Sequence, residues 1–408
     1  MKIGIVTDNY LPTLGGTEIS IINYSRQLRK MGHEVYIFCP NLGRNNPDPP
    51  LENTIRLLEF RFLNIIDHSI LIHRGIIGRF KRYDLDILHS QSQSSSPYVA
   101  DYISRKLRIP HVYTMHTLVP EHARIDKDTL PGMLFWYLHQ SVRLRSFKPP
   151  KGYLLQDERD ALALRVRICW LYMLRLAKVP DLVIFPTKNV LDIYKARGFR
   201  SKSRILPSFS DMFEGNSVQR TQSAHKRTRT RIIYVGRLGI EKRPQILIDA
   251  VNLLPDYLDW ELEIIGDGTQ RKKLERLVKK YKLHDRVKFM GGMDQMDIAQ
   301  RLVDADVFTM TSYRFDTQGI VLLEACGAGL PIVYCDNNLS VGVEPTNSVL
   351  TKPHAWGFSE GLAQMIEDKD LRDEFSRESL RIYKKYDSVS LTNKLIQIYK
   401  QAITDYRK

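Results

Sequence analysis

The 408-residue sequence predicts an α/β protein with two domains, each a doubly wound parallel sheet with helices on both faces. Short apolar runs rich in β-branched residues alternate with longer runs in which apolar residues recur at helical spacing. The alternation begins at Lys2, stops in a basic stretch at 216–231 and begins again at Ile232. The chain also exceeds the length at which one hydrophobic core keeps growing. We therefore expect two domains of similar size.

The composition sets limits on compartment and partners. Hydrophobic residues make up 43% and charged residues 26%, which is ordinary for a globular protein, but the net charge of +15 favours an acidic partner. The four cysteines are scattered and form no C-x-x-C pair, which fits a reducing cytoplasm and argues against structural zinc or disulfides. The first apolar run is too short for a signal-peptide core, and no stretch of eighteen apolar residues exists. We expect a cytoplasmic protein.

The first predicted βαβ unit covers the amino terminus. A strand at 2–7 is followed by a loop, by a helix from Thr17 to the stop at Gly32, and by a strand at 33–38. The loop holds Gly15 and Gly16, and glycine lets the backbone approach a phosphate or a sugar closely. A double glycine is also common in plain turns, so both interpretations stay open.

The alternation continues with strands at 86–89 and 111–115 around a helix at 97–106, then strands at 181–185 and 204–206. Parallel sheets bind ligands at the carboxyl ends of their strands. His116 follows one such strand end, which makes it a candidate catalytic residue, although a lone histidine is more often structural.

Residues 120–178 form a helical region in which aromatic and cationic side chains mix. Such a mixture suits an interface with anionic lipid, and it also suits core helices whose arginines and lysines reach water. On the first interpretation the membrane-facing cations are Arg143, Arg145, Lys148 and Lys151, and the rings of Trp136, Tyr137, Trp170 and Tyr172 lie at the headgroup level.

The stretch Ser217 to Arg231 has no acidic residue and almost no apolar one. We interpret it as the linker between the domains. A basic run of this kind also suits nucleic acid, but it lacks interleaved aromatic residues and a recognised module, so we expect no nucleic-acid partner.

The second domain repeats the pattern. A strand at 232–235 leads into a loop with Gly236, Arg237 and Lys242, and helices are expected at 244–254 and 270–281. Between these helices lie a strand at 261–265 and the turn Gly266, Asp267 and Gly268, and another strand follows at 287–290.

The most informative stretch is Ser312 to Pro331. A buried strand at 305–311 runs through a polar loop into a helix that opens at Gly319 and ends at Gly327 and Gly329. Such a helix start aims free backbone N–H groups and a positive dipole end at whatever lies above the loop. Asp316 and Glu324, eight positions apart, are placed to reach one polyhydroxyl ligand. The alternative is an ordinary βα unit with a solvated Asp and a surface Glu.

Taken in order, a set of short motifs resembles the retaining GT-B glycosyltransferases of family 4. The resemblance covers nearly the whole chain and rests on Gly15–Gly16, His116, Gly236–Arg237 with Lys242, Gly266–Asp267–Gly268, and the Asp316/Glu324 pair. It implies two Rossmann-like domains facing a cleft: residues 1–215 joined by a C-terminal helix at 387–408, a linker at 216–231, and a donor domain at 232–386.

The resemblance also implies roles for the site residues. Arg237 and Lys242 would neutralise the diphosphate of a nucleotide-sugar donor, and Glu324 would hold the ribose hydroxyls. Asp316 stands where the family usually has glutamate, on the 3-hydroxyl of the sugar, and is one methylene shorter. The backbone from Gln318 to Val321 would hold hexose and phosphate oxygens.

The expected function is transfer of a hexose from a UDP-linked sugar, with retention, to a lipid or lipid-linked glycan at the inner face of the cell membrane. The nucleotide sugar is a substrate, so no cofactor is expected. Both D-x-D pairs, Asp84/Asp86 and Asp304/Asp306, lead into apolar strands, so we interpret them as structural and infer no metal. The rivals are a soluble acceptor, a phosphorylase, and a non-catalytic sugar-binding partner of a glycosyltransferase.

Overall fold

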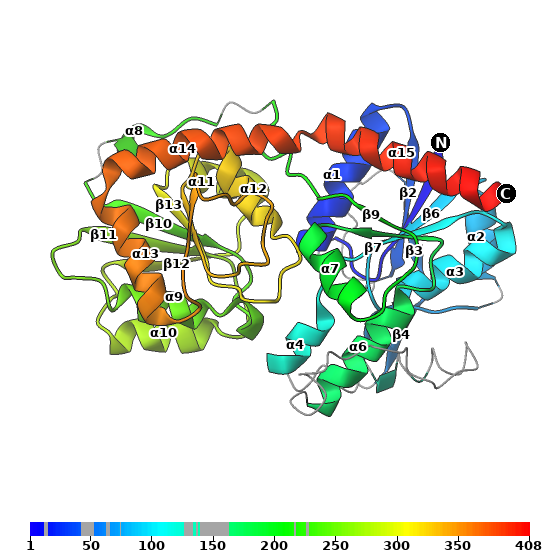
Figure 1. Cartoon of the computed structure of the whole chain (residues 1–408), viewed down its shortest axis with the longest axis horizontal. Coiled ribbons are helices and arrows are strands. Elements are labelled where there is room, and N and C mark those ends of the chain that lie inside the picture. Colours follow the sequence, from blue (N-terminus) through cyan, green and yellow to red (C-terminus); the bar gives the residue numbers. More distant parts are fainter. Residues whose placement is uncertain are drawn as a thin grey trace. The chain divides into compact units, whose positions relative to one another are not determined.

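The computed structural model describes residues 1–11, 15–41, 53–62, 66–73, 75–125, 134–135, 138, 163–215, 218–225 and 228–408. The chain divides into two compact units (Figure 1). Unit 1 is Met1–Ser208 with Ser388–Lys408, and unit 2 is Phe209–Asp387. The four cysteines are buried and unpaired.

Unit 1 is built on a parallel sheet of seven described strands in the order β3-β2-β1-β6-β7-β8-β9. The strands β4 and β5, which follow β3 in the sequence, form a separate antiparallel pair. The strands are β1 (Lys2–Val6), β2 (Glu34–Pro40), β3 (Thr54–Leu57), β4 (Glu59–Phe62), β5 (Ile66–Ile70), β6 (Ile87–Ser90), β7 (His111–Thr114), β8 (Leu182–Phe185) and β9 (Ser203–Ile205). The helices are α1 (Gly16–Lys30), α2 (Ile76–Lys81), α3 (Ser96–Leu107), α4 (Val119–Ile125), α6 (Leu164–Leu176), α7 (Lys188–Ala196) and α15 (Ser388–Arg407).

The central strands of unit 1 are buried along their whole length, as expected for a parallel sheet covered on both faces. The last helix, α15, packs beside α1 (Figure 1). From α15 the Tyr399 hydroxyl lies 2.7 Å from Nδ1 of His89 on β6. Both side chains are buried, so this hydrogen bond ties the C-terminal helix to the sheet of unit 1.

Unit 2 is built on a second parallel sheet, whose described strands follow the order β12-β11-β10-β13-β14-β15. They are β10 (Thr230–Val235), β11 (Trp260–Ile265), β12 (Val287–Gly291), β13 (Val307–Met310), β14 (Ile332–Tyr334) and β15 (Ser348–Leu350). The helical segments are α8 (Gln222–His225), η2 (Ile240–Lys242), α9 (Pro244–Val251), α10 (Arg271–Lys280), α11 (Gln295–Val303), α12 (Ile320–Gly327), α13 (Ala355–Glu367), α14 (Lys369–Tyr383) and η3 (Lys384–Tyr386).

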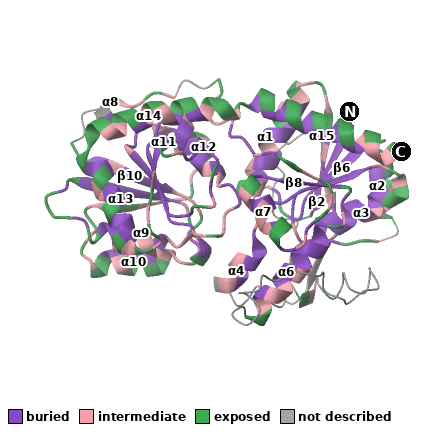
Figure 2. Ribbon diagram, in the orientation of Figure 1, coloured by how far each residue is buried: buried purple, intermediate pink, exposed green. Residues whose placement is uncertain are grey.

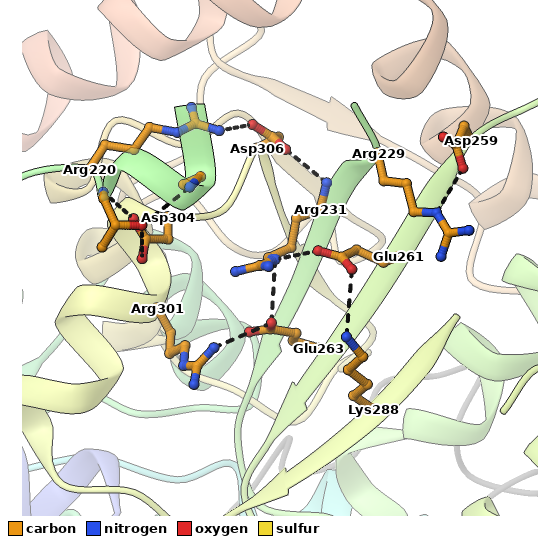
Figure 3. Close-up of polar contacts among 12 residues, drawn as sticks. Arg220, Arg229, Arg231, Asp259, Glu261, Glu263, Lys288, Arg301, Asp304 and Asp306 are labelled. Atoms are coloured by element: carbon orange, nitrogen blue, oxygen red, sulfur yellow. Dashed lines mark hydrogen bonds and ion pairs between the residues drawn. The ribbon is translucent and has the colours of Figure 1, made fainter. Parts of the chain in front are cut away.

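Two glutamates on the fully buried strand β11 are exceptions to its apolar character. Arg231 on β10 forms ion pairs with both of them, with its Nε 2.7 Å from Oε1 of Glu261 and 3.3 Å from Oε1 of Glu263 (Figure 3). Lys288 forms a further ion pair with Glu261 at 3.8 Å, and Arg301 forms one with Glu263 at 3.5 Å. Buried charges persist only when they are paired, so this cluster accounts for the glutamates structurally.

The passage between the units differs from the predicted linker. The chain crosses from unit 1 to unit 2 at Ser208–Phe209, and the described residues of 216–231 belong to unit 2. Arg220 forms an ion pair with Asp306 (Figure 3). The Thr221 N–H donates to Oδ1 of Asp304 at 2.7 Å. The basic stretch is thus fastened by acidic partners more than eighty positions later, which its own composition could not show.

Candidate active site

The loop after β10 in unit 2 is held by backbone contacts with the turn after β11. The Gly236 N–H donates to Ile265 O at 3.0 Å, and the Leu238 N–H donates to Asp267 O at 2.8 Å. Gly266 has φ +131°, and a Cβ there would lie 2.1 Å from the Gly236 carbonyl oxygen. Only glycine fits at this position, because the backbone of the turn after β11 packs directly against the backbone of the loop after β10.

The side chain of Asp267 is occupied within its own turn. Its Oδ1 accepts the Gly268 N–H at 2.7 Å, and its Oδ2 lies 3.2 Å from Nη1 of Arg271. The role of Gly266, Asp267 and Gly268 in holding a donor stays a prediction, and what the structure shows is that they shape the loop.

Arg237 and Lys242 lie on the same loop but have different partners. Arg237 has an exposed side chain, and its Nη2 lies 2.9 Å from Oε1 of the buried Glu241. Lys242 is much less exposed, and its Nζ lies 2.6 Å from Oδ1 of Asp316. The sequence prediction missed Glu241, although its spacing of four from Arg237 was a usable signal.

The ion pair between Lys242 and Asp316 is held from several sides. The Thr311 hydroxyl, just after β13, donates to the Lys242 carbonyl oxygen at 2.8 Å. The Lys242 ammonium also lies 5.3 Å from the centre of the Phe315 ring, within reach of a cation–π contact. A cation and a carboxylate from segments more than seventy positions apart are thereby fixed together at the carboxyl ends of β10 and β13.

Helix α12 begins where the sequence predicted. Its N-cap, Gly319, has φ +76° and ψ +76°, a left-handed conformation that glycine adopts readily. Gln318 and Ile320 are buried and Val321 is half-buried. The first N–H groups of a helix have no partner within it, so this start is suited to an anion or to ligand hydroxyls.

Two carboxylate oxygens at this helix lack partners. Oδ2 of Asp316 and Oε1 of Glu324 are buried, and neither makes a hydrogen bond in the described parts of the chain. Burial, with a smaller contribution from Asp211, raises the pKa of Glu324 to about 7. A buried acceptor without a donor is unfavourable, so both oxygens are prepared for donors from a ligand.

Asp336, which the sequence prediction did not assign, fixes the loop between β13 and α12. Its fully buried side chain accepts the Arg314 N–H at 2.6 Å through Oδ2 and the Asn338 N–H at 3.0 Å through Oδ1. Arg314 itself has a positive φ of 60°. Asp336 therefore stabilises the backbone that presents Asp316. Its place just after a strand was a signal, but its partner was not visible from the sequence.

The remaining predicted residues lie in unit 1. Gly15 is the N-cap of α1 with an extended backbone, and Gly16 is the first residue of that helix. His116 follows β7 and is half-buried. Its Nε2 donates to Oε1 of Gln91 at 2.5 Å, because an amide oxygen can only accept. Burial lowers the pKa of His116 to about 4, which keeps the imidazole neutral at pH 7.

Two family profiles match consecutive parts of the chain. The profile described as "Glycosyltransferase Family 4" matches residues 14–212, and the one described as "Glycosyl transferases group 1" matches residues 216–381. This chain is a group 1, family 4 glycosyltransferase. The fold class predicted from the sequence is confirmed.

Individual relatives are distant but span most of this glycosyltransferase. The chain is 25% identical over 349 residues to alpha-monoglucosyldiacylglycerol synthase from Acholeplasma laidlawii, covering 82% of this chain and 80% of that one. Among solved structures, it is similar to sucrose-phosphate synthase from Thermosynechococcus elongatus, with TM-score 0.72, 18% identity and 99% of both chains covered. It is also similar to Anabaena HepE in complex with UDP-glucose, with TM-score 0.70, 18% identity, and 98% and 100% covered.

One part of the membrane interpretation is wrong for this glycosyltransferase. Trp170 and Tyr172 on α6 are fully buried, so neither ring can lie at a headgroup level. The Arg197 guanidinium lies 4.1 Å from the centre of the Trp170 ring, and the Tyr172 hydroxyl donates to the Gln93 carbonyl oxygen. Aromatic residues of α6 fill the core of unit 1, which composition alone could not distinguish from a surface. The residues Trp136, Tyr137, Arg143, Arg145, Lys148 and Lys151 lie outside the described residues.

In each D-x-D pair of this glycosyltransferase, the second aspartate accepts a backbone N–H. Asp86 accepts the Lys2 N–H at 2.8 Å, and Asp306 accepts the Arg231 N–H at 2.8 Å. Both therefore hold strand ends, in agreement with the structural interpretation. In the described parts of the chain, no helix has the length and apolar character needed to cross a bilayer.

Proposed function

We propose that this glycosyltransferase moves a hexose from a UDP-linked sugar to a membrane lipid or lipid-linked glycan, with retention at the anomeric carbon. The observation that carries the donor assignment is the pair of buried, unpartnered carboxylate oxygens on Asp316 and Glu324. They lie on either side of the start of α12. A nucleotide sugar supplies what such a site lacks, namely hydroxyl donors for the carboxylates and phosphates for the helix start.

This geometry supports the following roles. Glu324 accepts ribose hydroxyls and Asp316 accepts a hexose hydroxyl through Oδ2, while Oδ1 keeps its ion pair with Lys242. That pair compensates for the short Asp316 side chain, because it fixes the carboxylate before the sugar arrives. Lys242 and the exposed guanidinium of Arg237 supply positive charge for the diphosphate.

In the transfer step the bond between the anomeric carbon and the diphosphate oxygen breaks, and a bond to the acceptor oxygen forms on the same face. The departing diphosphate takes both bonding electrons and accepts the proton of the acceptor hydroxyl. Negative charge on the leaving group grows in this step, so fixed cations beside it stabilise the transition state more than the ground state.

The acceptor assignment rests on two supports. A relative that spans most of this chain bears the name of a glucosyldiacylglycerol synthase. The net charge of +15 favours an anionic surface such as a phospholipid membrane. Both support the proposal of a peripheral contact with the cytoplasmic leaflet.

A panel of nucleotide sugars in a thermal-shift assay tests the donor. A ligand at a hundred times its dissociation constant adds about 2.7 kcal/mol to the free energy of unfolding, which raises the melting temperature measurably. We expect a UDP-linked hexose to give the largest shift, and Glu324→Ala to abolish it. A panel in which no nucleotide sugar stabilises the wild type would count against the proposal.

The proposed leaving-group chemistry uses side-chain cations, so activity should survive metal removal. We expect turnover in excess EDTA to stay within about twofold of the untreated enzyme, since Lys242 and Arg237 take the place of a metal at the diphosphate. Loss of activity in EDTA, with recovery on adding manganese or magnesium, would contradict this.

The proposed membrane contact has its own test. Changing Arg143, Arg145, Lys148 and Lys151 together to Ser should weaken binding to anionic vesicles, because each cation near such a surface contributes about 1 kcal/mol. Hydrolysis of the soluble donor should be unaffected. Binding of the wild type should also fall steeply with salt, as the Debye length is about 8 Å at physiological ionic strength. Equal binding of variant and wild type would remove these residues from the contact.

A further inference from the structure

Helix α10 in unit 2 carries a concentrated positive charge that the donor site does not use. The helix has one acidic residue, Glu275, against six basic ones: Arg271, Lys272, Lys273, Arg276, Lys279 and Lys280. Its apolar side is Leu274 and Val278, which are buried. Much of the rest of α10 is exposed (Figure 2). Lys272, Arg276 and Lys279 follow one another at spacings of four and three, so they form a single stripe on the opposite, exposed side.

Among the residues that the structure describes, this stripe has no acidic partner. Within the described residues, Arg271 pairs with Asp267 and Glu275, and Lys280 lies 5.6 Å from the Tyr281 ring. The described part of the chain provides no ion pair for Lys272, Arg276 or Lys279. The exposed helix α14 of the same unit is different, since its four basic residues are balanced by four acidic ones. A solvated helix of this protein therefore need not be basic.

The charges in the first half of α10 also work against the helix itself, whereas Lys279 lies in the last turn, where a cation is favourable. No acidic residue lies in the first turn of α10, where Lys272 and Lys273 face the positive end of the helix dipole. Lys272 and Arg276 are a like-charged pair at a spacing of four, which destabilises a helix. An external anionic surface would offset both effects, and the described part of the chain places no such negative charge beside the stripe.

We propose that the Lys272–Arg276–Lys279 stripe of α10 docks on an anionic phospholipid bilayer. A bilayer fits better than nucleic acid because the stripe has charge without exposed aromatic rings between its cations to stack on bases. The inference rests on the membrane contact in the proposed function and adds a surface in unit 2 to it. Attraction of this kind is reversible and fades within a Debye length.

The test is flotation with vesicles in which about a third of the lipid is phosphatidylglycerol, compared with pure phosphatidylcholine vesicles. The test variant is Lys272→Gln/Arg276→Gln/Lys279→Gln. The control, Lys369→Gln/Arg377→Gln/Lys384→Gln, removes the same charge from exposed residues of α14 and η3 in the same unit. Each cation contributes a factor of about five to binding, so the test variant should bind between tenfold and about a hundredfold more weakly. The control should stay within about twofold of wild type.

The outcomes separate this inference from the proposed function. The α10 variant should hydrolyse soluble donor like the wild type and melt at the same or a higher temperature, because like-charge repulsion has been removed. Equal losses in variant and control, or no loss in either, would overturn the inference. Vesicle binding that depends on Arg143, Arg145, Lys148 and Lys151 but not on α10 would overturn it and leave the membrane contact intact. A loss confined to binding of a single-stranded oligonucleotide would also overturn it.

Discussion

Replacing Lys242 by alanine should raise the activation free energy by about 3 kcal/mol, which lowers turnover roughly 150-fold, while nucleoside binding changes little. The reason is that Lys242 faces charge that grows on the leaving diphosphate, so its loss is felt mainly in the transition state. Arg237→Ala should lower turnover less than Lys242→Ala, because the Arg237 side chain is 67% exposed and that of Lys242 only 20%. The measurement is kcat at saturating donor, with UDP affinity determined separately. Lys369→Ala, at an exposed lysine of the same unit, is the control.

An indirect effect through Asp316 must be distinguished from this direct one. Among the described residues, Lys242→Ala leaves neither oxygen of the largely buried Asp316 carboxylate with a partner, which could distort the site without any role for the lysine in catalysis. The double variant Lys242→Ala/Asp316→Asn removes that stranded charge. We expect it to be as slow as the single variant or slower. Recovery of turnover in the double variant would assign Lys242 to positioning instead of phosphate stabilisation.

Donor affinity should depend on pH through Glu324. Burial raises the pKa of this side chain to about 7, and ribose hydroxyls donate best to the ionised form. The fraction of ionised Glu324 grows as pH rises through 7, so the apparent affinity for UDP increases and then levels off. If only that form binds, the dissociation constant of UDP should be about tenfold larger at pH 6 than at pH 8. Isothermal titration calorimetry across this range measures it.

Glu324→Gln should weaken UDP binding and make it independent of pH over the same interval, because the amide does not titrate. Glu374→Gln, at an exposed glutamate on α14, should leave both affinity and its pH profile unchanged. A wild-type affinity that is flat between pH 6 and pH 8 would show that the donor does not use the Glu324 carboxylate. A titration that persists in Glu324→Gln would assign the pH dependence to another group.

The elements that carry the site could largely be predicted from the sequence. The start of α12, the loop after β10 and the turn after β11 fall where apolar periodicity and glycines placed them. These features are local, because a strand that runs into a glycine-led helix is encoded within about twenty residues. The resemblance to the glycosyltransferases added the ordering of the motifs.

Other features depend on partners far away in the chain and could not be predicted. The composition of the basic stretch 216–231 is typical of a linker, but in the structure Asp304 and Asp306 bind its residues Thr221 and Arg220. The aromatic residues of α6 form a sequence pattern typical of a membrane-facing helix, but the fold buries them in the core of unit 1. The buried Asp336 and the pairing of Lys242 with Asp316 both join segments that only the fold brings together.

The proposed reaction is the transfer of a hexose from a nucleotide sugar to a lipid. The direct measurement incubates the enzyme with radiolabelled UDP-hexoses and anionic vesicles that contain diacylglycerol or a polar lipid extract, and then counts label in the organic phase. We expect label in the lipid fraction with matching release of UDP, little of either with Lys242→Ala, and normal values with Lys369→Ala. Absence of both lipid label and UDP release across the whole donor panel, from enzyme that is folded and binds the vesicles, would contradict it.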